Sequence, residues 1–420
     1  MTEFIENKEI KERVILIGIS TGDGEDAQAS LQELSELVKT AGADAIDQMI
    51  QKREAAHPAT YLGKGKMEEV KWKIWETDAT GIVCDDELSP AQLRNLEEAL
   101  ETKVMDRTMV ILDIFASRAK TKEGKIQVEL AQLRFRAARL VGIHNSLSRL
   151  GGGIGTRGPG ETKLEVDRRR IHQRIGQLKS ELEEVKRHRE VARQQRARNH
   201  VPVAAIVGYT NAGKSTLLNH LTGAGILAED KLFATLDPTT RKLSLLDGQE
   251  ILLTDTVGFI RKLPHHLVEA FKSTLEEAKY SDVILHVVDV SNPQMEMQMH
   301  VVYETLRELG IGDKVMVTVF NKMDRLEGEV LLRDFSSDYQ VKISAKSGKG
   351  FSELFGILEG ILRSRRVYLE KVFPYSEAGK IAQIRKAGQL LAEDYTEAGI
   401  AVKAYVPAEM FAGFFVDAGE

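Results

Sequence analysis

Residues 201–215 read Val201-Pro-Val-Ala-Ala-Ile-Val-Gly208-Tyr-Thr-Asn-Ala-Gly213-Lys214-Ser215. An apolar run is followed by a glycine loop and a helix start, and the loop fits G-x-x-x-x-G-K-[ST], which cradles the phosphates of a nucleoside triphosphate. Lys214 adds positive charge between the outer phosphates, and the Ser215 hydroxyl can ligate Mg²⁺. A chance glycine-rich turn is the alternative, and the preceding strand argues against it. We expect nucleotide contacts from Gly208, Tyr209, Thr210, Asn211, Ala212, Gly213, Lys214 and Ser215.

A second apolar strand, Ile251-Leu-Leu-Thr-Asp255-Thr-Val-Gly258, ends in the pattern D-x-x-G. An acid at the tip of such a strand can hold a water of the Mg²⁺ shell, and a glycine amide three residues on can reach the γ-phosphate. The pattern alone is weak, because ordinary turns also produce it. Its place after the phosphate loop makes it informative here, so we expect Asp255, Thr256, Val257 and Gly258 to meet the nucleotide, with Lys214 and Gly258 acting in catalysis.

The base is indicated by Val315-Met-Val-Thr-Val-Phe320, which leads into Asn321-Lys322-Met323-Asp324. A carboxylate at Asp324 can accept hydrogen bonds from N1–H and the 2-amino group of guanine, which adenine lacks. Sites of this kind reject such an analogue by roughly 10⁴ to 10⁵. Lys322 is expected to stack its stem on the base or brace the phosphate loop, with a solvated loop lysine as the alternative. Further candidates follow another predicted strand end: Ser344, Ala345 and Lys346. The backbone amide of Ala345 could meet the guanine carbonyl oxygen.

The segment between the first two motifs reads Lys231-Leu-Phe233-Ala-Thr235-Leu-Asp237-Pro238-Thr239-Thr240. A threonine here would close over Mg²⁺ only when a γ-phosphate is present, which would make the segment a nucleotide-dependent switch. Three threonines compete for this role, and their spacing does not choose between them.

Composition favours a globular protein without a membrane span. The chain has 420 residues, 42% of them hydrophobic and 29% charged, and its net charge is −5. These values suggest two to four domains. Its one cysteine, Cys84, excludes an intramolecular disulfide and suits a reducing compartment. No signal segment starts the chain, and the apolar runs are too short for membrane spans of ~20 residues. We expect a monomeric, cytoplasmic protein, a fraction of which could lie at the membrane periphery.

Strand and helix patterns predict a multidomain α/β protein. Strand–helix alternation fills residues 1–105, which we expect to form an N-terminal α/β domain with a parallel sheet. A long antiparallel helical hairpin is expected at 106–199, with a possible interruption at Glu123-Gly124. A P-loop GTPase domain is expected at 200–366, and a small C-terminal α+β domain at 367–420.

The second helix of the hairpin is expected to carry a coiled-coil seam, because its apolar residues step four, three, four, three: Ile171, Ile175, Leu178, Leu182 and Val185. Between Glu161 and Arg198 there are twelve Lys/Arg against seven Asp/Glu, an excess of 12 − 7 = +5. The joining loop, 142–160, contains both glycines and arginines, and arginine can bind phosphate through two hydrogen bonds or stack on bases. A flexible linker is the alternative. The candidates for RNA contact are Arg149, Gly151, Gly152, Gly153 and Arg157.

Several stretches resemble the HflX family of ribosome-associated GTPases, within the translation-factor class. They are Phe233-Ala-Thr-Leu-Asp-Pro-Thr-Thr-Arg241, Asp255-Thr-Val-Gly-Phe-Ile-Arg-Lys-Leu-Pro264, Gly151-Gly-Gly-Ile-Gly-Thr-Arg-Gly-Pro-Gly-Glu161 and Tyr61-Leu-Gly-Lys-Gly-Lys66. The likeness covers nearly the whole chain up to about residue 370. It assigns the switch threonine to Thr235, with Ser215 as the other metal ligand, and it brings into the nucleotide site Phe233, Ala234, Leu236 and Asp237.

This resemblance implies a GTP-hydrolysing, Mg²⁺-dependent switch on the large ribosomal subunit that contacts rRNA and splits or rescues stalled ribosomes under stress. One position departs from small Ras-like GTPases, because Phe259 stands where a water-orienting glutamine could sit. We therefore expect slow turnover that a large partner accelerates, although Phe259 could also be a core residue of the switch. His265 and His266 are candidates for structure or RNA contact only.

Two other functions remain open from the residues. One is a nucleotide-gated scaffold that docks a protein partner on the hairpin, because charged helices are often solvated faces or partner seams. The other is an ATP-dependent enzyme, which Asp324 disfavours. Deleting residues 151–160 would separate a scaffold, which should keep its partner, from an RNA-contacting switch.

Overall fold

The computed structural model describes residues 11–21, 25–147, 163–198, 201–223, 232–245, 249–264, 277–326, 328, 331–364, 366–407 and 410–411. These residues form two compact units. The first comprises Met1–Val185, Glu229–Asp237 and Gly258–Ser273, and the second comprises Lys186–Ala228, Pro238–Val257 and Thr274–Glu420. Two short segments of the central region thus belong to the first unit, although the chain on both sides of each belongs to the second.

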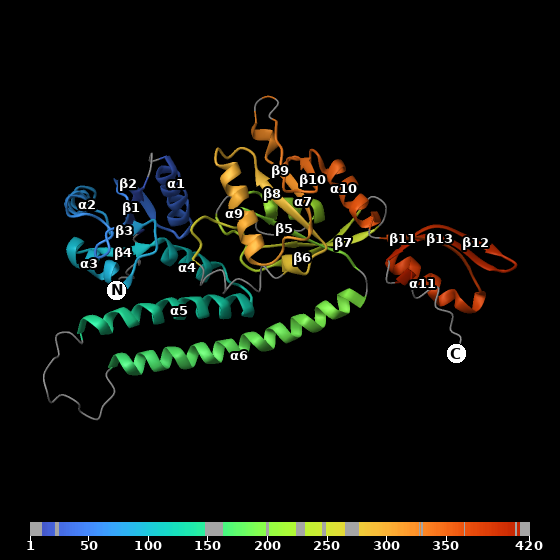
Figure 1. Cartoon of the computed structure of the whole chain (residues 1–420), viewed down its shortest axis with the longest axis horizontal. Helices are drawn as coiled ribbons and strands as arrows, with labels where there is room; N and C mark the ends of the chain where they lie inside the picture. Colours follow the sequence, from blue (N-terminus) through green and yellow to red (C-terminus); the bar gives the residue numbers. More distant parts are fainter. Residues whose placement is uncertain are drawn as a thin grey trace, which may run out of the picture. The chain divides into compact units, whose positions relative to one another are not determined.

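The first unit starts with a four-stranded parallel sheet in the order β2-β1-β3-β4 (Figure 1). Strands alternate with helices as expected: β1 (Arg13–Ser20), α1 (Glu25–Thr40), β2 (Asp44–Lys52), α2 (Lys64–Thr77), β3 (Gly81–Cys84), α3 (Pro90–Leu100) and β4 (Lys103–Asp106). Ser89 accepts a bond from the Gln92 amide and forms a capping box with its side chain, as the Ser-Pro start of α3 predicts. The sequence does not predict strand β4, because Val104 and Met105 are its only apolar residues, whereas the equally short β3 contains no charged residue.

Three helices complete the first unit and lead into the second: α4 (Arg107–Arg118), α5 (Lys122–Leu147) and α6 (Lys163–Arg198). Helices α5 and α6 pack through Ile126, Leu130, Ile175 and Leu178. The Glu129 carboxylate binds Arg174 by bonds of 2.7 and 3.0 Å. The break between α4 and α5 lies just before Lys122 rather than at Glu123-Gly124, because Thr121 accepts the Gly124 amide and starts the new helix.

Two expectations about this region change or go untested. Helix α5 extends to Leu147, so the first residues of the loop expected at 142–160 are helical. The five RNA-contact candidates lie outside the described residues: Arg149, Gly151, Gly152, Gly153 and Arg157.

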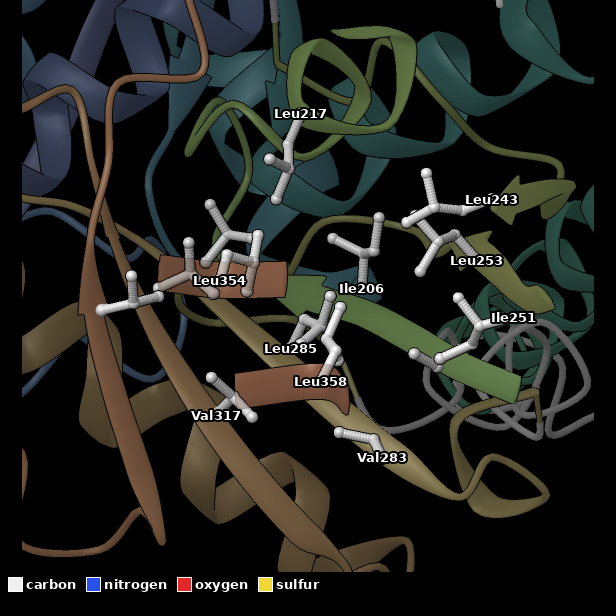
Figure 2. Packing of buried hydrophobic residues seen from close by; sticks show 14 of the residues in the cluster. Ile206, Leu217, Leu243, Ile251, Leu253, Val283, Leu285, Val317, Leu354 and Leu358 are labelled. Atoms are coloured by element: carbon white, nitrogen blue, oxygen red, sulfur yellow. The ribbon is translucent and has the colours of Figure 1, made fainter. Parts of the chain in front are cut away.

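The second unit contains a six-stranded sheet in the order β10-β9-β8-β5-β7-β6, in which only the pairing of β6 with β7 is antiparallel. Its elements are β5 (Val203–Gly208), α7 (Lys214–Thr222), β6 (Thr239–Ser244), β7 (Glu250–Asp255), β8 (Val283–Asp289), α9 (Met295–Glu308), β9 (Val315–Asn321), β10 (Tyr339–Lys342) and α10 (Phe351–Ser364). Figure 2 shows side chains from the strands meeting those of α7 and α10, including Ile206, Leu217, Leu285 and Leu358. This core fixes the strand ends that carry the motifs.

A three-stranded antiparallel sheet, β11-β13-β12, follows with one covering helix. The elements are β11 (Arg366–Phe373), α11 (Ala378–Ala387), β12 (Gln389–Thr396) and β13 (Gly399–Pro407). Its small core includes Leu369, Phe373, Ile384 and Val402. Among the described residues of the whole chain, no helix is both long enough and apolar enough to cross a membrane.

Candidate nucleotide-binding site

The phosphate loop connects β5 to α7, and its glycines are required by close approach. Gly208 and Gly213 adopt φ values of 151° and 95°. A Cβ at Gly208 would collide with the Val287 carbonyl oxygen of β8, and one at Gly213 would collide with the Asn321 amide nitrogen. Only glycine fits at both positions. The loop therefore lies directly against the next strands of the sheet.

Lys214 is buried at the start of α7, and its ammonium donates to the carbonyls of Gly208 at 3.1 Å and Tyr209 at 2.8 Å. Burial, aided by the charge of Lys322 and opposed by the Asp255 carboxylate, lowers the pKa of Lys214 to about 8. The side chain folds back over its own loop, so a bound phosphate would compete with two carbonyls for the ammonium. Phosphate oxygens carry full negative charge and make the stronger, charge-assisted bonds.

The Ser215 hydroxyl donates to Asp255 Oδ2 at 2.7 Å, and Asp255 is fully buried at the end of β7. A hydroxyl oxygen and a carboxylate oxygen at the mouth of a phosphate loop are the hard donors that Mg²⁺ prefers beside phosphate. These two residues fit a magnesium site. The Thr256 hydroxyl donates to the Ile206 carbonyl at 2.8 Å and fixes the chain beyond Asp255 to β5.

The ends of β9 and β10 converge on the same edge of the sheet. Asn321 donates from Nδ2 to the Ala212 carbonyl at 2.9 Å and accepts from the Ala345 amide at 2.8 Å. One buried amide side chain thereby ties the phosphate loop to the loop after β10. The Ala345 amide, expected to face the guanine carbonyl, is used by Asn321 in the structure, so contact with a base requires that this bond be shared.

Lys322 and Asp324 are each held by a partner. Lys322 pairs with Asp289 at 2.7 Å, and both side chains are largely buried. The Ser344 hydroxyl donates to Asp324 Oδ1 at 2.6 Å. This bond, together with nearby cationic side chains, holds the pKa of Asp324 below its usual value although burial acts the other way. An ionised, oriented and exposed carboxylate is what recognition of two neighbouring N–H donors requires.

Two supporting residues were missed by the sequence interpretation. Asp289 ends β8 beside β9, and a polar residue at the carboxyl end of a parallel strand was the available signal. His220 of α7 lies 2.8 Å through Nδ1 from the Ala345 carbonyl, and its ring packs edge-on against Phe351. Both residues hold candidate base-binding residues, since His220 contacts Ala345 and Asp289 binds Lys322.

The candidate switch residues belong to the first unit. Phe233 and Leu236 are each 2% exposed, and Thr235 between them is partly buried. Phe259, directly after Gly258, is also 2% exposed. This burial agrees with a core function for Phe259 in the second segment. His265 and His266 lie outside the described residues.

Comparison with known proteins identifies the family. Models described as "GTP-binding GTPase N-terminal", "GTP-binding GTPase Middle Region" and "50S ribosome-binding GTPase" match residues 28–116, 118–196 and 203–322. GTPase HflX of Lacrimispora saccharolytica is 77% identical over 412 residues, 98% of this chain and 97% of that protein. The chain belongs to the HflX GTPase family. GTPase HflX of Escherichia coli (strain K12) is 45% identical over 350 residues, 83% of this chain and 82% of its own.

Among solved structures, a complex of SsGBP with GDP covers 83% of this chain and 98% of its own at 26% identity, with a TM-score of 0.48. A GTP-binding protein from Sulfolobus solfataricus with GDP gives 25% identity and a TM-score of 0.44. The HflX family membership shows that this chain binds and hydrolyses GTP. The predictions of a P-loop GTPase and of the HflX family are confirmed.

Proposed function

We propose that this HflX family GTPase is a Mg²⁺-dependent switch that binds the large ribosomal subunit and splits or rescues stalled ribosomes under stress. The observation that carries the GTP-dependent part of the proposal is the Asp324 carboxylate, oriented by Ser344 in the loop that Asn321 ties to the phosphate loop. That geometry lies within or next to residues 203–322, which match a family described as a 50S ribosome-binding GTPase.

Recognition of guanine is proposed to rest on Asp324. Its carboxylate would accept from N1–H and the 2-amino group, and adenine would leave it without these donors. Lys322, held by Asp289, would cover one face of the base with its alkyl stem. Asn321 contributes indirectly, because it keeps the base loops and the phosphate loop together.

Phosphate chemistry is proposed to use positioned charge rather than a general base. Lys214 and the loop amides would stabilise charge on the leaving and transferred phosphates. Mg²⁺ would be held by Ser215 and Thr235, with Asp255 holding a water of its shell, and the ion would neutralise charge between the outer phosphates. Gly258 would contribute its amide to the γ-phosphate. The buried Phe259 cannot polarise the attacking water, which supports slow turnover without a partner.

Contact with rRNA is proposed for the Gly-rich loop and for the exposed basic residues at the start of α6. Arg168, Arg169 and Arg170 are exposed. Arg170 lies 4.0 Å from the Asp167 carboxylate. Arg174 binds Glu129, and Arg139 binds Asp106 at 2.5 Å with its guanidinium 3.8 Å from the Phe135 ring centre. The excess of +5 counted between Glu161 and Arg198 lies in residues 186–198, which hold six Lys/Arg against one Asp/Glu, whereas residues 161–185 hold six of each.

The test is co-sedimentation of the full chain with separated ribosomal subunits, using a non-hydrolysable GTP analogue or GDP. We expect binding to the large subunit with the analogue, an affinity that falls steeply with salt, and faster single-turnover hydrolysis with ribosomes. Deletion of residues 151–160 should abolish ribosome splitting and leave GTP binding intact. Equal hydrolysis rates with and without ribosomes would refute the stimulated switch, and retained function after deletion would favour a protein-docking scaffold.

A further inference from the structure

The candidate switch segments are fastened to the N-terminal part of the chain by specific contacts. Glu229–Asp237 and Gly258–Ser273 group with Met1–Val185 in the first unit. The relevant part of that unit is the end of α4 and the start of α5, residues 115–124, which we call the α4–α5 corner. The contacts lie on both sides of Thr235, the threonine proposed to ligate Mg²⁺.

On one side of Thr235, the Asp237 carboxylate occupies the N-terminus of α5. Asp237 Oδ2 accepts from the amides of Lys120 and Thr121, each at 2.9 Å. The Thr121 hydroxyl donates to Asp237 Oδ1 at 2.5 Å and accepts the Gly124 amide at 2.9 Å. A carboxylate more than a hundred residues away therefore joins Thr121 in capping this helix. The positive end of a 26-residue helix favours that negative charge.

The corner is shaped to receive this carboxylate. A Cβ added at Gly124 would collide with Asp237 Oδ1. Gly124 lies in the first turn of α5, where glycine is a poor helix former compared with alanine. The close approach of Asp237, and not the helix itself, therefore explains why position 124 is a glycine.

On the other side of Thr235, the Phe233 ring packs edge-on against Phe115 of α4, with ring centres 4.7 Å apart and planes at 77°. Both rings are almost completely buried. Phe233 also has a left-handed backbone, with φ of 53°, which a phenylalanine rarely adopts. Tertiary contact must hold this conformation in place, and the Phe115 ring is one such contact.

We propose that Thr121 and Asp237 are positioning residues for GTP hydrolysis, because they and the Phe115–Phe233 pair fix the chain on either side of Thr235. The inference rests on the proposed function, in which Thr235 ligates the metal. The α4–α5 corner would thus set the geometry of a metal ligand from outside the GTPase sheet. The competing explanation is that these contacts only add stability, and it predicts a different kinetic result.

The decisive experiment compares Asp237→Asn, Thr121→Val and Gly124→Ala in the full-length protein. Asp237→Asn removes the charge, Thr121→Val removes the hydroxyl, and Gly124→Ala displaces an unchanged Asp237. We expect each to lower kcat for GTP about 10- to 100-fold, because a misplacement of ~1 Å in a catalytic group can cost 10²-fold. The affinity for GDP should stay unchanged, and the Mg²⁺ concentration for half-maximal hydrolysis should rise.

Two controls separate positioning from stability. Thr121→Ser keeps the hydroxyl and should restore the wild-type kcat and Mg²⁺ requirement. Ser89→Ala removes the N-cap of α3, a helix of the same unit, and should lower the melting temperature without changing kcat. If Ser89→Ala lowers kcat as much as Asp237→Asn, or if Asp237→Asn leaves kcat unchanged, the inference is wrong.

Thr235→Ala distinguishes this inference from the function beneath it. If Thr235→Ala does not reduce kcat, the metal-ligand assignment fails. If it does and Asp237→Asn does not, only the positioning inference fails. With both correct, adding Asp237→Asn to Thr235→Ala should cause little further loss, because the two changes remove one shared interaction.

Discussion

The candidate base-binding loops and the candidate switch segments belong to one GTPase sequence but are held in different ways. The base loops are tied by groups of the same sheet, with Asn321 joining the loops after β5 and β10 and Asp289 of β8 holding Lys322. The switch segments are held by Thr121 and by Asp85 and Asp86, more than a hundred residues earlier in the chain. One region is assembled within the second unit, whereas the other depends on the first.

This difference is what base selection and a nucleotide-dependent conformational change would each require. A pocket that selects a base benefits from rigid, preformed donors and acceptors, since each must be in place before binding. A switch needs an element with two arrangements whose free energies differ by little. The left-handed residues Phe233 and Lys262 each cost of order 1 kcal/mol, which surrounding contacts must offset.

The largest effect is expected for a change in the candidate base-binding loops, at Asp324. Asp324→Asn replaces an acceptor with an amide that can donate to the 2-carbonyl of xanthine. We expect the ratio of GTP to XTP affinity to change by roughly 10⁴, since a site that loses its required hydrogen bonds loses discrimination on that scale. Calorimetric titration of both nucleotides measures the ratio.

The matched control for that prediction is Asp313→Asn, the same chemical change at an exposed position of the second unit. It should leave both affinities unaltered. An unchanged preference for GTP in Asp324→Asn would mean that another group recognises the guanine edge. The candidate base-binding loops could then not be contrasted with the switch segments as the region that selects the base.

Sequence patterns were sufficient to bring the motif residues to one edge of the sheet, because each motif is local. The loop from Gly208 to Ser215, Asp255 and Asn321 to Asp324 each follow a strand, and parallel strands bring their ends to one edge of a sheet. The alternating elements of the first unit were equally readable. By contrast, β4 has only two apolar residues, Val104 and Met105, between charged ones, and the break before α5 depends on Thr121 accepting the Gly124 amide.

The contacts of the switch segments could not be predicted from sequence. Asp237 lies in a motif that the resemblance placed at the nucleotide, yet its carboxylate binds Lys120 and Thr121. No local pattern pairs residues separated by 116 positions, and the only sign was Gly124, a poor helix former in a helical stretch. A glycine without an evident turn deserves a search for a distant group that approaches it.

A second prediction uses the pH dependence of the phosphate loop. The pKa of Lys214 is lowered to about 8 by burial, and phosphate favours the charged form, so it should be higher in the complex. Between these two values binding takes up a proton, and GTP affinity should fall as pH rises, by at most about tenfold per unit. Below pH 8 the lysine is charged in both states and contributes no slope.

Guanosine is the control for this titration, because it shares the base but lacks phosphates. The difference between the GTP and guanosine profiles isolates the lysine from titration of the base. Identical profiles above pH 8 would show that Lys214 remains charged in the free protein, for instance because its bonds to the Gly208 and Tyr209 carbonyls outweigh burial.

The smallest effect concerns the second switch segment. The Lys262 ammonium binds Asp85 at 2.5 Å and Asp86 at 2.6 Å, and Asp86 also accepts from the Tyr61 hydroxyl at 2.7 Å. Tyr61 and Lys262 belong to two separate stretches that resemble the HflX family, and Asp86 joins them. Lys262→Met keeps the stem and removes the charge, so amide hydrogen exchange in residues 258–264 should become faster.

We expect that acceleration to be about fivefold, because a partly exposed ion pair contributes up to ~1 kcal/mol. Losing the pair lowers the free energy of local opening by that amount, and the exchange rate rises accordingly. Lys403→Met breaks a comparable exposed pair with Glu370, at 2.8 Å, in the C-terminal sheet and should leave this segment unchanged. Asp86→Asn should cause a smaller acceleration, because Asp85 still binds the Lys262 ammonium, and adding it to Lys262→Met should change little further. Unaltered exchange in Lys262→Met would mean that the apolar residues Phe259 and Ile260, both buried, hold the segment without help from charge.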